Sequence, residues 1–135
     1  MAAPDDIVQK IEELTESDRR YKKEAYFFLY SALDYTVRKL GRYHYPTERE
    51  RHVTGQELLK GISEYGWAQY GPMTKAVFAH WGITKTSDFG EMVFTLVKAG
   101  LMSKTEEDTL EDFRDVYGFD EEFDWEKRRE TVHLQ

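Results

Sequence analysis

The sequence has no cysteine, few prolines and no long apolar run, and each absence removes a class of protein. Without cysteine, disulfide frameworks and thiolate metal sites are excluded, and a reducing compartment is the simplest location. Three prolines and nine glycines are too few for a sandwich of many short strands. No stretch approaches the ~20 apolar residues of a membrane span, and residues 1–10 contain no signal-peptide core. We therefore expect a cytoplasmic protein that does not bind membranes.

The common motifs of catalysis and cofactor binding are also missing. There is no Gly-x-Ser-x-Gly elbow, no glycine-rich phosphate loop and no HExxH motif. The spacing of His44 and His52 fits no common zinc site, and Trp125 stands where a calcium loop over residues 120–131 would need glycine. We therefore predict no catalytic residue, no cofactor and no metal. A small enzyme without a recognisable motif is kept as a second alternative.

The chain contains enough apolar residues for one domain with a single core. Of its 135 residues 40% are hydrophobic and 15% aromatic. The net charge of −7 is unevenly distributed, because residues 106–126 hold 11 acids and a single arginine. We predict a helical domain over residues 1–118, followed by an acidic and aromatic tail over residues 119–135 that is partly docked or disordered. Aromatic rings at Phe119, Phe123 and Trp125 are expected to hold this tail against the body.

Residues 54–102 are the most regular part of the sequence. Thr54 and Glu57 form a capping box that opens a helix over residues 55–70, and Gly71-Pro72 separates it from a second helix over residues 72–81. Gly61 and Gly66, inside the first helix, indicate that a neighbouring helix or Trp67 comes close. In the second helix the apolar positions that we expect to pack are Met73, Ala76, Val77 and Trp81.

The remaining segments are also predicted to be helical. Gly82-Ile83 is typical of a left-handed C-cap, after which a third helix covers residues 88–99. The longest helix is expected over residues 19–40, because its apolar positions cover more than one face. A short helix starts at Pro4, and residues 106–117 are predicted to form the last amphipathic helix. The fold class is therefore all-α, a single-domain bundle of about five helices.

The three consecutive helices resemble the core of a winged helix-turn-helix domain. The resemblance is carried by the Gly82 turn, by Phe89, Val93 and Leu96, and by the Gly-Leu-Met exit at residues 100–102. It implies a tri-helical core and, as the alternative fold, an α+β domain with a short hairpin over residues 101–109. DNA binding through this surface is not expected, because the recognition helix and the wing would both present acids to phosphate.

Basic residues gather between residues 19 and 52. The stretch over residues 42–53 has no helical periodicity and joins two predicted helices. Exposed helix faces and a solvated crossover explain this composition without any function. The functional interpretation is a patch for nucleic acid, with Tyr43 and Tyr45 available for stacking. Its candidate residues are Arg38, Lys39, Arg42, Arg49 and Arg51.

The function that the sequence favours is a non-catalytic protein-interaction module. Aromatic residues are frequent near its turns and at its acidic end, and aromatic side chains are enriched at interface hot spots. The partner is then another protein, and nucleic-acid binding through the basic residues is the first alternative. The predicted partner-binding residues are Tyr43, Tyr45, Phe119, Phe123 and Trp125. The sequence does not predict an oligomeric state.

Several motifs resemble those of one bacterial protein family. They are the run GQELLKGISEYGWAQYGPM, followed by WGI, SDFGEMVF, LVKAGLM and SKTEEDTLEDF. They are similar to a family of small conserved-hypothetical bacterial proteins found mainly in planctomycete and verrucomicrobial lineages, and the likeness extends from about residue 21 to residue 123. The resemblance implies a self-contained bacterial domain and supplies no mechanism and no functional residue.

Overall fold

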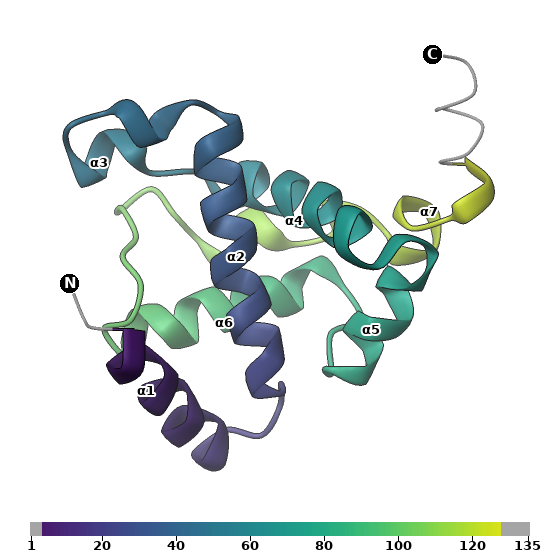
Figure 1. Ribbon diagram of the computed structural model, residues 1–135, viewed down its shortest axis with the longest axis horizontal. Coiled ribbons are helices and arrows are strands. Elements are labelled where there is room, and N and C mark those ends of the chain that lie inside the picture. Colours follow the sequence, from purple (N-terminus) through teal and green to yellow (C-terminus); the bar gives the residue numbers. More distant parts are fainter. Residues whose placement is uncertain (1–3, 128–135) are drawn as a thin grey trace.

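The computed structural model describes residues 4–127 and shows a bundle of helices (Figure 1). Within this range the helices differ greatly in length, and three short 3-10 helices (η) connect them. The elements in chain order are α1 (Pro4–Ser17), α2 (Lys23–Lys39), η1 (Arg42–His44), α3 (Glu48–Arg51), α4 (Gly55–Tyr70), η2 (Gly71–Met73), α5 (Thr74–His80), α6 (Thr86–Lys98), η3 (Leu110–Phe113) and α7 (Phe119–Glu122).

The all-α prediction is confirmed, and the winged-helix alternative is wrong. No β-strand occurs anywhere in residues 4–127, and residues 101–109, where a hairpin would lie, form an irregular loop. In the same range no helix is both long and apolar enough to cross a membrane. The predicted capping box is present: Thr54 Oγ1 accepts from the Glu57 amide at 3.1 Å, and Glu57 Oε1 accepts from the Thr54 amide at 2.9 Å.

Helices α2 and α4 cross at a contact that only glycine allows. A Cβ atom on Gly61 would lie 1.7 Å from the Oγ1 atom of Thr36. Thr36 is almost fully buried, and its hydroxyl donates to the carbonyl oxygen of Ala32 at 2.7 Å. The glycine therefore gives up helix propensity so that the two backbones can approach closely. This agrees with the neighbouring helix that the glycine pattern predicted.

A cluster of aromatic rings around Phe78 of α5 forms the centre of the core. Phe78 is completely buried, and its ring contacts five others, with centroid distances of 5.2 to 6.1 Å. The five rings are Phe28, Trp81, Phe89, Phe119 and Phe123. The expectation for this helix was wrong in part, because Met73 and Ala76 are exposed. Such a short helix has one side against α4, and Phe78 occupies it.

The predicted helix over residues 106–117 is absent, and only the 3-10 turn η3 forms there. Asp108 Oδ2 accepts a hydrogen bond from the Thr105 amide at 2.8 Å, and Asp112 Oδ2 accepts one from the Thr109 amide at 3.0 Å. These side-chain bonds compete with helical backbone bonds and turn the chain twice. Asp115, at φ 47°, then adopts a left-handed conformation that ends any helical path.

The acidic C-terminal segment is held to the body by buried groups. Thr86, 1% exposed, donates its hydroxyl hydrogen to the Phe113 carbonyl at 2.7 Å and accepts from the Val116 amide at 3.2 Å. Further along, Phe119 and Phe123 are each 5% exposed and lie against Phe78. Apolar burial of rings therefore anchors α7, although the sequence around it is strongly acidic.

Candidate functional site

An apolar pocket opens where several parts of the chain meet at the α3 end of the molecule. It is surrounded by the C-terminal half of α2, by α3 and the residues up to the start of α4, by the middle of α6, by the loop over residues 101–108 and by η3. Its volume is about 170 Å³. The apolar pocket, as we call it below, is lined on its hydrophobic side by Leu33, Val37, Val53, Leu58, Val93, Phe94, Met102 and Phe113.

A larger polar groove of about 960 Å³ continues from the mouth of the apolar pocket. Five carboxylates line it, against two permanently cationic side chains and one histidine, so we call it the acidic groove. Its charged and titratable lining consists of Glu48, Glu106, Glu107, Asp108, Asp112, Arg49, Lys104 and His52. The residues shared by pocket and groove are Glu48, His52, Thr54, Ser103, Lys104 and Asp108. A single ligand can therefore contact both.

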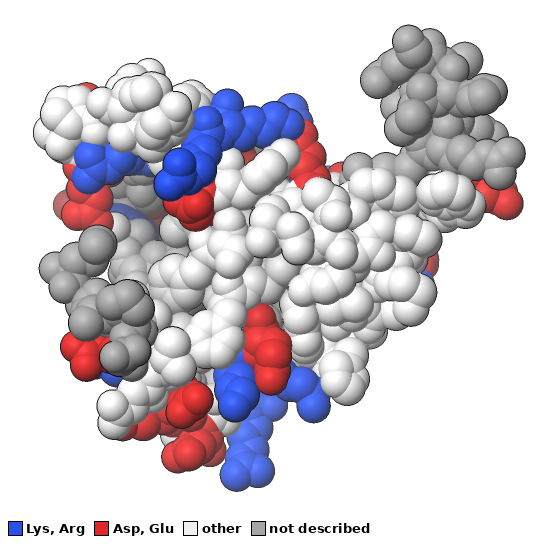
Figure 2. Space-filling model, in the orientation of Figure 1, with Lys and Arg blue, Asp and Glu red and all other residues white. Residues whose placement is uncertain are grey.

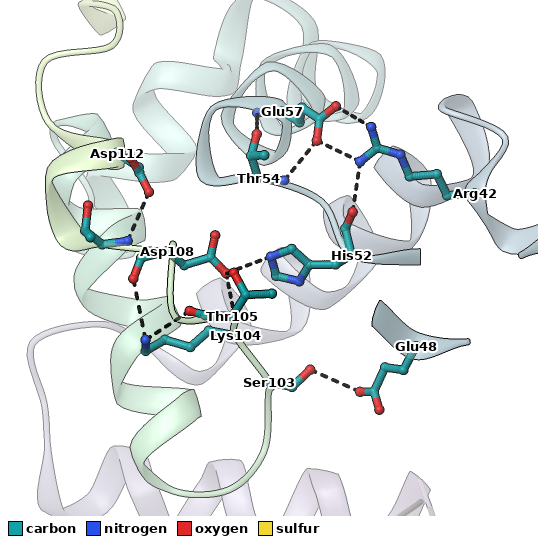
Figure 3. A network of polar contacts seen from close by, with 11 residues as sticks. Arg42, Glu48, His52, Thr54, Glu57, Ser103, Lys104, Thr105, Asp108 and Asp112 are labelled. Carbon is teal, nitrogen blue, oxygen red and sulfur yellow. Dashed lines mark hydrogen bonds and ion pairs between the residues drawn. The ribbon is translucent and has the colours of Figure 1, made fainter. Parts of the chain in front are cut away.

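One wall of the site is fixed by the bidentate ion pair between Arg42 and Glu57 (Figure 3). Both nitrogen–oxygen distances are 2.7 Å, and Arg42 Nη1 also donates to the His52 carbonyl at 2.9 Å. Hydrogen bonding to Arg42 lowers the pKa of Glu57 below its usual value. Because Glu57 belongs to the capping box, the start of α4 and the chain at His52 are held as one unit.

The opposite wall approaches the first through His52 and Asp108, which belong to segments far apart in sequence. His52 Nε2 lies 2.7 Å from Asp108 Oδ2. This buried nitrogen has no hydrogen-bond partner within residues 4–127. The two side chains are therefore in close contact without the geometry of a hydrogen bond. Asp108 is itself fixed by the Thr105 amide, so the loop is already shaped before a ligand arrives.

A second bridge between the two walls joins Glu48 and Ser103 (Figure 3). The Ser103 hydroxyl donates to Glu48 Oε1 at 3.0 Å. Beside it, Lys104 Nζ donates to the backbone carbonyls of Thr105 and Asp108 at 3.2 and 3.5 Å. Lys104 is therefore held against its own loop, and together with Arg49 it opposes five carboxylates in the groove.

The hydroxyl and the imidazole of the site are not paired with each other. The only hydroxyl with a carboxylate partner across the groove is that of Ser103, and it donates to Glu48 instead of to His52. In the described part of the chain, no group of three or more histidine, aspartate and glutamate side chains could hold a metal ion.

The pair formed by Arg42 and Glu57 predicts a pH dependence of stability. Since the pKa of Glu57 is lowered on folding, the pair stabilises the protein fully above the unfolded-state value of ~4.3 and progressively less as the pH falls through the folded-state pKa. Glu57→Gln preserves the capping box and removes the charge. We expect the variant to be less stable at about pH 7, by up to ~1 kcal/mol, and the difference to shrink as the pH falls through the folded-state pKa of Glu57.

Thermal unfolding of both proteins across this pH range checks the prediction. Glu111→Gln is the matched control, because Glu111 forms only an exposed pair with Arg114 at 3.5 Å. The control should follow the wild type at every pH. An equal stability difference between Glu57→Gln and wild type at high and low pH would contradict the assignment.

The aromatic residues predicted for partner binding lie in different places. Tyr43 and Tyr45 are about half exposed beside α3, and Arg51, which lines the apolar pocket, donates to the Tyr45 carbonyl at 2.6 Å. Phe119 and Phe123 are buried in the core and so are not at the surface in this conformation. Trp125 is 48% exposed and stacks on Trp67 at 6.3 Å. It follows α7, which lies at the opposite end of the molecule from α3 (Figure 1).

The predicted basic patch is largely paired within the chain. Arg38 binds Asp34, Lys39 binds Glu64, and Arg42 binds Glu57. In Figure 2 the blue side chains above the C-terminal end of α2 accordingly have red ones directly beside them. Arg49 and Arg51 lie instead at the groove and the pocket, among acids. These five cations therefore do not form one uncompensated surface.

Most residues of the candidate site were not identified from the sequence. His52 was considered for a zinc site, and Asp108 was assigned to the predicted helix over residues 106–117. The two segments are about 50 residues apart, and no local pattern indicates that they meet. The irregular stretch over residues 42–53 was the available signal, because such loops often carry function.

Comparison of the chain with protein-family models, with curated proteins and with solved structures found no match.

Proposed function

We propose that this protein is a non-catalytic interaction module that binds another protein through the acidic groove and the apolar pocket. The observation that carries the proposal is the half-open apolar pocket of about 170 Å³ at the base of a polar groove. An apolar pocket surrounded by polar groups is the usual form of a site that anchors one side chain of a partner.

Two further features support binding by a prearranged surface. The walls of the groove are linked by the contacts of His52 with Asp108 and of Glu48 with Ser103, so less ordering is required on association. Tyr43 and Tyr45 stand exposed next to α3 and can extend the contact beyond the groove. Phe119 and Phe123 take no part in this proposal, because they pack in the core.

The nucleic-acid alternative has less support. Phosphate binding needs cations that are free to replace counterions. Three of the five candidate cations, Arg38, Lys39 and Arg42, already bind carboxylates of this chain. The other two lie at a pocket and groove with an excess of acids, which would repel a phosphate backbone.

Filling the pocket should remove partner binding without unfolding the protein. Val37, which lines the pocket from α2 and is only partly buried, is changed to phenylalanine so that the ring occupies the space of the anchor. Val8→Phe, on an exposed position of α1, is the matched control. Cross-linking and affinity purification from the native host should recover the same partner with wild type and Val8→Phe, and lose it with Val37→Phe.

Thermal unfolding of the three proteins shows whether Val37→Phe is folded. The larger ring is expected to cost about 1 kcal/mol of stability. Recovery of one specific partner at equal yield with all three proteins would contradict the proposal. Recovery of chaperones alone with the wild type would also contradict it.

A further inference from the structure

The apolar pocket has the size of one hydrophobic side chain. Its volume is about 170 Å³, and a dry apolar cavity of about 150 Å³ is known to accept a benzene molecule. A leucine, methionine or phenylalanine side chain therefore fits, whereas a lipid chain or a second ring does not. Met102 and Phe94, on the α6 side, allow some adjustment of shape, since methionine is flexible and polarisable.

The groove around this pocket has unused negative charge. Glu48, Asp108 and Asp112 accept hydrogen bonds from Ser103, Thr105 and Thr109, at 3.0, 2.8 and 3.0 Å. The side chains of Glu106 and Glu107 are exposed and have no hydrogen bond or ion pair within residues 4–127.

The cations of the groove do not cancel this charge. Lys104 donates to two carbonyls of its own loop, and Arg49 is the other permanently charged base. The groove therefore attracts a cationic ligand and repels an anionic one. Because the groove and the pocket share six lining residues, the cationic groups of that ligand must lie next to its apolar group.

We infer that the site takes a short basic segment of another protein, in which one leucine- or phenylalanine-sized side chain is flanked by lysine or arginine. This inference rests on the proposed function and names the chemistry of the partner. The apolar side chain enters the pocket between α2, α4 and α6. The flanking cations contact Glu106 and Glu107 at the rim, where they replace water and gain opposite charge.

The full-length protein is titrated into a fluorescein-labelled peptide GKKSLSKKG, and binding is followed by fluorescence anisotropy. Replacing the leucine by serine should weaken binding at least about tenfold, because the pocket is then left without its anchor. Raising the salt from about 50 to about 500 mM should weaken it by a similar factor. A peptide GEESLSEEG should show no measurable binding.

The protein variants test the same contacts without disturbing the core. Glu106→Gln combined with Glu107→Gln should weaken binding of GKKSLSKKG about three- to tenfold. Glu121→Gln combined with Glu126→Gln changes the net charge equally at the α7 end and should leave the affinity unchanged. Equal weakening by the two double variants would reduce the effect to net charge and overturn the assigned site.

The outcomes separate this inference from the proposed function. If GEESLSEEG binds as tightly as GKKSLSKKG and Val37→Phe abolishes both, the pocket binds peptides but the basic class is wrong. If no peptide binds while Val37→Phe still loses its native partner, the inference fails and the proposed function stands. If oligouridine RNA binds and GKKSLSKKG does not, the nucleic-acid alternative replaces both.

Discussion

Gly61→Ala should lower the free energy of unfolding by about 3 kcal/mol, because the added methyl group has no space between α2 and α4. The new Cβ would stand 1.7 Å from Thr36 Oγ1, so α2 and α4 must move apart or Thr36 must leave its rotamer. For a domain of this size the melting temperature should fall by about 10 °C. Thermal and urea unfolding measure both quantities.

Two further variants identify the contact. Thr36→Ala in the Gly61→Ala background removes the hydroxyl at 1.7 Å and leaves Cβ at 2.9 Å from the new methyl, so part of the stability should return. Gly118→Ala is the matched control, because Gly118 has φ −90° and nothing lies within 4 Å of its added Cβ. Its melting temperature should equal that of the wild type or lie slightly above it. A Gly61→Ala protein as stable as Gly118→Ala would show that the helices are not in close contact.

Phe113→Ala should cost about 3–5 kcal/mol and also damage the candidate site. The ring is 3% exposed and fits between Gly55 and Gly90, where an added Cβ would come within 2.8 Å of it on either side. It also lines the apolar pocket. Removing it leaves a cavity that continues the pocket, so the anchor of a partner would lose one wall.

Chemical denaturation gives the stability change, and the peptide titration gives the effect on binding. Leu110→Ala, in the same 3-10 turn, is the control: Leu110 is 44% exposed, and its truncation should cost less than about 0.5 kcal/mol. A Phe113→Ala protein with unchanged stability would mean that the ring is not a core residue. If affinity for GKKSLSKKG were unchanged in a folded Phe113→Ala protein, the pocket could not be the anchor site.

The residues around the site explain why its charge distribution could not be predicted from the sequence. Arg42 and Arg49 look alike in the sequence, each in a basic loop. In the structure the first is tied to Glu57 at 2.7 Å, and the second borders a groove rich in acids. A count of basic residues cannot distinguish these states, because the neutralising acids come from other elements. Only the structure therefore showed that acids of this chain neutralise part of the predicted basic surface.

Sequence alone determined those features that depend on neighbours within about four residues. The capping box of Thr54 and Glu57 marks the start of α4, and the Gly82 cap places φ at 94° with Ile83 bonded back to Phe78 at 2.8 Å. These rest on hydrogen bonds and steric preferences between adjacent turns. The all-α fold class follows for the same reason, since helical periodicity is local.

Tertiary structure alone decided which side chains meet. It replaced a predicted helix after Thr105 by aspartate-capped turns that Thr86 binds, and it buried Phe78 in the core while Met73, which was expected to pack, is exposed. It also brought His52 within 2.7 Å of Asp108 to form a site. Such contacts join segments tens of residues apart, and their free energy depends on the burial and charge that both segments create together, which neither segment encodes in its own pattern.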